Sequence, residues 1–214
     1  MYINPVNGYK ITEFYRNARV CDAHNKMDVK CCLERLREFH EMKLQVEHEF
    51  DLFAQIEFYE SLWQGTPSGY SDYAETKSRV FSLQQYINEY KEEYCLTHID
   101  AVPDNFLILS DGSVKLIDWE YAAMQDPHVD IAIFAIYSLY DKDQVDSLID
   151  IYFDGYCPKE IRIKIYCYIA VCGLLWSNWC EYKEKLGVKF CEYAYRQYQY
   201  AKDFFDIVQM NLIN

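Results

Sequence analysis

The feature that most constrains the fold is a hairpin pattern at residues 106–117, set in a chain that otherwise reads as helix. Two apolar runs, Phe106–Leu109 and Val114–Ile117, flank the polar sequence Ser-Asp-Gly-Ser at 110–113. Apolar runs on either side of an Asp-Gly turn are typical of two antiparallel strands. Because the two ends of such a hairpin lie side by side, the residues just before and just after it should meet.

Hydrophobic periodicity predicts helices on both sides of this hairpin. Asp28 is expected to cap the first helix, an apolar stripe runs from Phe50 to Trp63, and a third helix is expected over 73–90. Everything after Asp118 reads as helical, in segments expected at 127–140, 143–154, 158–186 and 188–210.

A short strand pair is predicted at the N-terminus. Its strands are residues 2–3 and 9–14, the turn at 4–8 contains Pro5, and the polar stretch 16–25 links the pair to the helices. One internal hairpin and one strand remnant within a helical body make the fold class α+β, mainly α.

Charge and hydropathy limit the partners. The chain carries 21 basic and 34 acidic residues, a net charge of −13, which repels phosphate backbones and excludes nucleic acid as an expected partner. The same field attracts small cations. The longest apolar run, Ile165–Trp176, is shorter than the roughly 20 residues of a membrane span, and no signal peptide is visible at the start.

Nine cysteines are present, and none forms a C-x-x-C pair. Several lie on helical patterns beside apolar residues, which favours reduced core thiols in a cytoplasmic protein. A zinc site or a disulfide framework is the less favoured alternative.

Polar residues stand at both ends of the hairpin. Asp100 and Asn105 precede it and Asp118 follows it, so the three side chains are expected at one point. Oxygen ligands gathered in this way suit a hard cation such as Mg²⁺. Each residue alone is equally explained as a turn residue, but a set of turn residues does not explain why the three converge.

The spacing H-x-D-x-x-x-x-N, from His98 to Asn105, then a hairpin and then Ile117-Asp118-Trp119-Glu120, resembles the catalytic and metal loops of kinase-fold phosphotransferases. Trp and Glu after the aspartate, in place of the Phe-Gly of protein kinases, are similar to the choline kinase and aminoglycoside phosphotransferase branch. The stretch from Lys10 to Arg19, the pair Phe39-His40 and Tyr193 near the end also resemble bacterial choline kinases.

The resemblance implies a role for each loop residue. Asp100 would position the acceptor hydroxyl group and take its proton, and His98 would support the loop. Asn105 and Asp118 would hold Mg²⁺ on the phosphates of ATP. The implied fold is the C-terminal lobe of a protein-kinase-like phosphotransferase.

The resemblance implies further roles outside the loop. Asp130 would anchor the catalytic loop through backbone N–H groups, and Glu120 would approach the metal or the substrate or serve only as a helix-start charge. Tyr15 and Asn17, in the stretch from Tyr15 to Ala18, would form the hinge that contacts adenine.

The acceptor is suggested by an aromatic set. Trp176 and Trp179 share a helix face at i and i+3, and aromatic faces bind quaternary ammonium groups. With Tyr193, they match the choline box of choline kinases. Aromatic residues at helical spacing are otherwise core residues, so composition alone leaves both readings open. An aminoglycoside site would instead need many carboxylates, and no acidic cluster lies near the end of the chain.

No G-x-G-x-x-G can be written with the seven glycines, and few residues precede the linker. We therefore expect residues 1–19 to be a remnant N-lobe hairpin and hinge, and 20–214 to be the helical C-terminal lobe. The leading function is ATP-dependent phosphorylation of choline or a related amino alcohol. The alternatives are a catalytically impaired binding module and an aminoglycoside-type phosphotransferase. A homodimer or a second chain that supplies the missing lobe is also expected.

Overall fold

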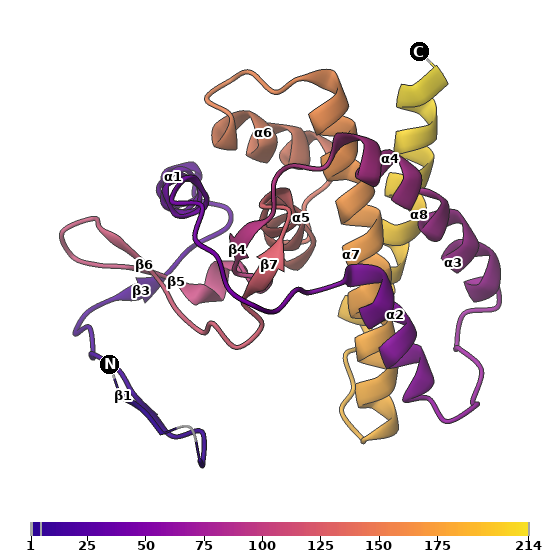
Figure 1. Ribbon diagram of the computed structural model, residues 1–214, viewed down its shortest axis with the longest axis horizontal. Coiled ribbons are helices and arrows are strands. Elements are labelled where there is room, and N and C mark those ends of the chain that lie inside the picture. The colour runs from indigo at the N-terminus through magenta and orange to yellow at the C-terminus, as the bar shows by residue number, and fades with distance from the viewer. Residues whose placement is uncertain (1, 5, 214) are drawn as a thin grey trace.

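The computed structural model describes residues 2–4 and 6–213, in which most helices gather on one side of the molecule and three small antiparallel sheets lie beside them, with the N-terminal hairpin extending away from the helices (Figure 1). Pro5 of the predicted turn lies outside the described residues. The mainly α fold class is confirmed, with strands confined to short segments. The helices are α1 Lys26–Glu41, α2 Leu52–Ser61, α3 Tyr73–Ser82, α4 Gln84–Tyr90, α5 His128–Tyr137, α6 Lys142–Tyr152, α7 Lys159–Lys185 and α8 Glu192–Ile213.

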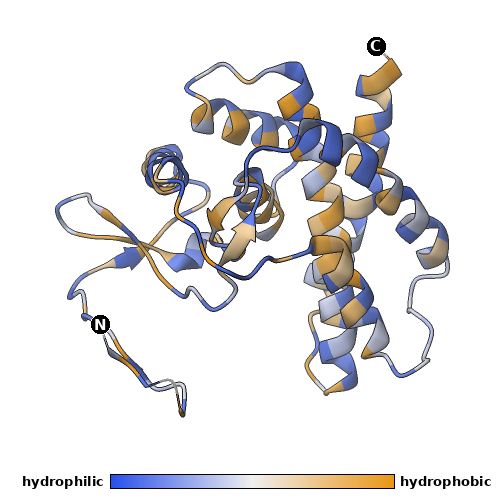
Figure 2. Cartoon of the chain, in the orientation of Figure 1, coloured by the Kyte–Doolittle hydropathy of each residue, from blue (hydrophilic) through white to orange (hydrophobic). Residues whose placement is uncertain are grey.

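The long helix α7 is the centre of the helical body. It packs against α8, α5 and α2, and apolar residues run along much of its length (Figure 2). A Cβ added at Gly173 would lie 2.7 Å from the backbone oxygen of Gln197, so glycine is needed for the close approach of α8. By length and composition α7 is apolar enough to cross a membrane, but 89% of its most apolar window is buried within the protein, as in a core helix.

Two predictions about the helices before the hairpin are wrong. The first helix is capped by Asn25, whose side chain accepts from the amides of Met27 and Asp28. Asp28 lies inside the first turn, where it is buried and ion-paired with Arg19, and this pair lowers the pKa of its carboxyl group. The helix expected over 73–90 is interrupted at Leu83, which ends α3 and begins α4.

The predicted hairpins at 106–117 and at the N-terminus are both present, the segment 94–97, whose sequence reads as short and extended, contains β4, and two further strands were not expected. β3 lies in the stretch expected to be a linker, and β7 lies where the chain was expected to be helical. The strands pair as β1 Tyr2–Ile3 with β2 Lys10–Ile11, β3 Arg19–Val20 with β5 Phe106–Ile108 and then β6 Val114–Leu116, and β4 Cys95–Thr97 with β7 Ala123–Gln125.

Pairing with strands distant in the sequence explains why β3 and β7 were not predicted. Ala, Met and Gln have no strong strand preference, but all three residues of β7 are buried against β4. β3 adds to the edge of β5, with Arg19 opposite Ile108. The segment 98–105 therefore connects the β4–β7 sheet to the β3–β5–β6 sheet. All nine cysteines are free.

Candidate active site

The segment between β4 and β5 folds into a tight loop around Asp100. The side-chain Nδ2 of Asn105 donates to the backbone oxygen and to Oδ2 of Asp100, each at 2.8 Å. The amide of Val102 donates to the same backbone oxygen, also at 2.8 Å. These bonds close the loop on itself, so the Asp100 carboxylate has a fixed direction.

The Asp100 carboxyl group is partly buried, and burial is the main reason that its pKa is raised to about 6. The hydrogen bond from Asn105 opposes this shift, whereas the negative charges of Asp118 and Glu120 add to it. A carboxylate whose pKa lies near neutrality is a better proton acceptor than an ordinary aspartate.

The hairpin brings Asp118 to this loop. The amide of Ile117 donates to the backbone oxygen of Asn105 at 3.0 Å, and Nε2 of His98 donates to the backbone oxygen of Ile117 at 2.9 Å. Asp118 itself has a φ of 62°, which turns the chain sharply as it leaves the hairpin. Trp119 then packs on the His98 ring, with centroids 4.7 Å apart.

The donor set at this point fits Mg²⁺. The hydrogen bonds of the Asn105 side chain leave from Nδ2, so its Oδ1 is available as a ligand. Asp118 Oδ1 already lies 2.9 Å from the ammonium group of Lys10, which stands in for a cation. Among the described residues no group of three or more His, Cys, Asp or Glu residues forms a metal site. A metal here would therefore share its remaining ligands with phosphate oxygens and water.

A cavity of about 340 Å³ opens beside Asp100. Four residues singled out in the sequence besides Asp100 line it: Glu120, Trp176, Trp179 and Tyr193. Sequence reasoning missed the other lining residues, which come from α5 and from loops, including the loop before α8. They are Val102, Tyr121, Ile133, Ile136, Tyr137 and Phe190.

Aromatic rings form the wall of this cavity that α7 and α8 provide. The rings of Trp176 and Trp179 meet edge-on with centroids 5.7 Å apart, and Phe190 lies 5.0 Å from Trp179. Tyr137 lies 6.1 Å from Tyr193. Trp176 is 9% exposed, so most of its area is core packing and only part of it faces the cavity. The one available signal for Phe190 was its place three residues before Tyr193.

The two residues expected at the adenine hinge lie apart from the cavity beside Asp100. Tyr15 and Asn17 fall between β2 and β3 and do not line the cavity beside Asp100. The Tyr15 hydroxyl donates to Glu13 at 3.0 Å, and Asn17 is exposed with a φ of 65°. Their contact with a nucleotide stays a prediction.

Comparison with known proteins identifies relatives of this chain. The profile of the phosphotransferase enzyme family matches residues 32–166, more than half of the chain. The protein LicA of Haemophilus influenzae is 27% identical over 208 residues, covering 89% of this chain and 75% of that protein. The crystal structure of choline kinase LicA from Streptococcus pneumoniae is 28% identical, with a TM-score of 0.78, and the match covers 91% of this chain and 69% of that one. A structure of LicA in complex with AMP is 27% identical, with a TM-score of 0.82, over 97% and 72% of the two chains.

Proposed function

The chain belongs to the phosphotransferase enzyme family, and from that premise we propose that it transfers the γ-phosphoryl group of ATP to the hydroxyl group of choline or a closely related amino alcohol. One observation carries the proposal. A single cavity has the Asp100 carboxylate on its lining together with the aromatic rings of Trp176, Trp179 and Tyr193. This is the arrangement that a small alcohol with a cationic head requires.

The cavity suits such a molecule in size and in charge. About 340 Å³ accommodates a small ligand of this kind. The rings offer negative faces to a methylated ammonium group, and little water has to be removed from such a cation. Glu120 adds a carboxylate to the same lining. The LicA relatives, one of them a choline kinase by description, support this choice of acceptor.

The chemical step uses Asp100. As the acceptor oxygen forms its bond to the γ-phosphorus atom, the bond from that atom to the β,γ-bridging oxygen breaks and ADP departs. The proton of the acceptor hydroxyl group passes to an Asp100 carboxylate oxygen, and Asn105 holds that carboxylate in place. Mg²⁺, when bound by Asn105 and Asp118, would neutralise charge on the phosphates. The AMP complex of a LicA relative supports a nucleotide as donor, and we assign the reaction to the cytoplasm.

The N-terminal hairpin is assigned to the nucleotide side of the site, with Tyr15 and Asn17 next to adenine. Its apolar side chains are largely exposed, with Phe14 at 86% and Tyr9 at 74%. Exposed apolar residues of this kind favour association with a second copy or another polypeptide. Light scattering on the purified chain tests this, and a strictly monomeric species at working concentration contradicts it.

The test of the function is a coupled ADP-release assay with ATP, Mg²⁺ and choline, with ethanolamine and an aminoglycoside as alternative acceptors. Loss of the proton acceptor in Asp100→Asn should lower kcat by about 10²- to 10⁴-fold. Asp111→Asn, on the exposed hairpin turn, is the matched control and should retain activity. Choline binding without any turnover, or turnover that Asp100→Asn leaves intact, would overturn the proposal.

A further inference from the structure

Asp130 on α5 is the anchor of the loop that carries Asp100. It is fully buried, and its Oδ2 and Oδ1 accept from the backbone amides of His98 and Ile99 at 2.9 and 2.8 Å. The second of these bonds ends one residue before Asp100. The direction of the Asp100 carboxylate is therefore set in part by where the Asp130 carboxylate lies.

The loop needs such an anchor because its backbone is strained at the same place. Ile99 has a φ of 65° and is fully buried. A β-branched residue rarely adopts this left-handed conformation, and it persists only where the surroundings fix it. The bond from the Ile99 amide to Asp130 is the described contact that holds this amide in place.

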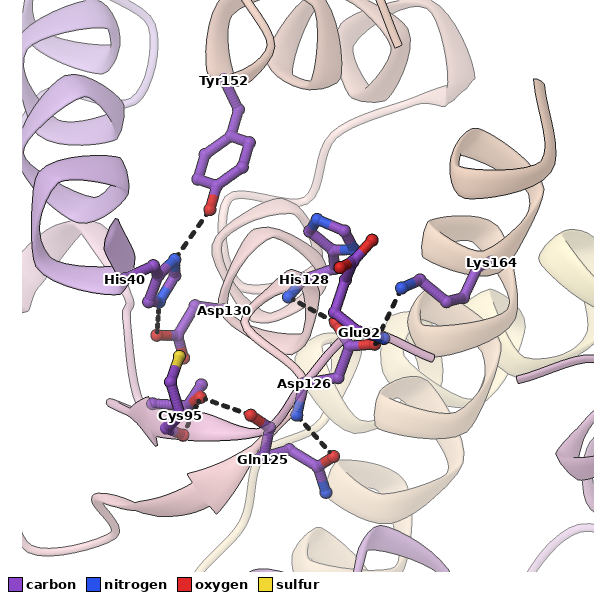
Figure 3. Close-up of polar contacts among 10 residues, drawn as sticks. His40, Glu92, Cys95, Gln125, Asp126, His128, Asp130, Tyr152 and Lys164 are labelled. Carbon is purple, nitrogen blue, oxygen red and sulfur yellow. Dashed lines mark hydrogen bonds and ion pairs between the residues drawn. The ribbon is translucent and has the colours of Figure 1, made fainter. Parts of the chain in front are cut away.

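A chain of buried side chains holds Asp130 from the other side (Figure 3). His40, at the end of α1, has its Nε2 3.0 Å from Asp130 Oδ2. Its Nδ1 lies 2.8 Å from the hydroxyl group of Tyr152, at the end of α6. His40 and Tyr152 are 3% and 6% exposed. Burial raises the pKa of Tyr152, so its hydroxyl group stays protonated and donates to Nδ1, which leaves the Nε2 proton on the side of the carboxylate.

We propose that His40 and Tyr152 are positioning residues for the phosphoryl acceptor site, acting through Asp130 on the backbone of the loop that carries Asp100. The role in turnover rests on the proposed function, but the effect on the loop does not. Neither residue lines the cavity beside Asp100. Their removal should therefore change the rate of the chemical step and leave acceptor binding intact.

The test compares Tyr152→Phe and His40→Gln with a matched control, Tyr200→Phe. Tyr200 is equally buried and its hydroxyl group donates to a backbone oxygen, that of Tyr140, at 2.7 Å, but it has no described contact with the loop. Hydrogen exchange of peptides covering 97–105 gives a readout that needs no turnover. Tyr152→Phe should speed exchange there by about five-fold, the equivalent of one lost hydrogen bond, whereas Tyr200→Phe should not change it.

Steady-state kinetics gives the second readout. Tyr152→Phe should lower kcat several-fold with KM for choline unchanged, and adding it to His40→Gln should cost little more, because the two residues act in series. Circular dichroism confirms that each variant folds. Exchange at 97–105 that matches Tyr200→Phe in both variants would overturn the inference. Faster exchange in a chain that has no kinase activity would overturn the proposed function and leave the positioning role standing.

Discussion

The charged groups on the two sides of the loop that carries Asp100 differ in burial. On one side, buried polar groups are paired. Asp130 accepts from the amides of His98 and Ile99 and contacts His40, and Lys164 and Asp126, both fully buried, form an ion pair 2.8 Å long (Figure 3). On the other side, Asp118 meets Lys10 in a pair whose side chains are 44% and 55% exposed. The buried side fixes geometry, while the open side leaves charged groups free to exchange partners. Four predictions test this difference.

The largest effect is expected for Asp130→Ala. Three N–H donors would lose a buried carboxylate acceptor, so the free energy of unfolding should fall by about 3 to 5 kcal/mol. Asp118→Ala removes a carboxylate from the open side and should cost less than about 1 kcal/mol. Urea unfolding measures both values. Equal losses in the two variants would mean that the two sides do not differ as described.

The second prediction concerns pH and two buried histidines. Burial lowers the pKa of His98 and that of His128, the latter to about 3, whereas an unfolded histidine titrates near 6.5. The unfolded chain therefore binds protons that the folded chain excludes. Stability should be full above pH 6.5 and should decrease below it, by up to about 1.4 kcal/mol per pH unit for each histidine, with the His128 contribution lost progressively towards pH 3.

The measurement is the free energy of unfolding in urea across this pH range. In His128→Gln the slope should be smaller by about one proton, because one of the two excluded sites is gone. A slope that is the same in this variant and in the unmodified chain contradicts the assignment.

The third prediction concerns the aromatic wall of the cavity beside Asp100. Trp179→Ala should weaken choline binding by about 1 to 2 kcal/mol, because a desolvated cation loses a ring face. Calorimetry measures it, with Tyr156→Ala as the control, since Tyr156 is 78% exposed and does not line the cavity. Unchanged choline affinity in Trp179→Ala would show that the aromatic wall does not bind the acceptor.

The smallest effect is expected for Lys10→Met. Its ammonium group is ion-paired with the Asp118 carboxylate and competes there with a metal ion. Its removal should therefore tighten Mg²⁺ binding at low salt by no more than a few-fold, because an exposed ion pair contributes little free energy. The difference should disappear at high salt. Titration calorimetry at two ionic strengths measures it, with Lys159→Met as a charge-matched control. A gain that persists at high salt would show that this pair behaves like a buried one.

Sequence reasoning reached the parts of the site that depend on local pattern. The Asp-Gly turn between two apolar runs specifies the hairpin, and the hairpin places Asn105 beside Ile117. The pairing of β7 with β4 could not be predicted, because the sequence of Ala123–Gln125 does not favour a strand and the strand depends on pairing with β4. The same limit applies to His40. Its helix was predicted, but its contact with Asp130 spans 90 positions and depends on how α1, α5 and α6 pack.

The close contact at Gly173 has a consequence for acceptor choice. Trp176 and Trp179 follow it on α7, and Tyr193 lies near the start of α8, so the spacing of the two helices sets how far apart these rings stand. A larger side chain at this position would force α8 outwards and widen the aromatic wall. Under the proposed function, this backbone contact limits the size of the acceptor although no acceptor would touch it, and a change of substrate could begin there without any change in the residues that line the cavity.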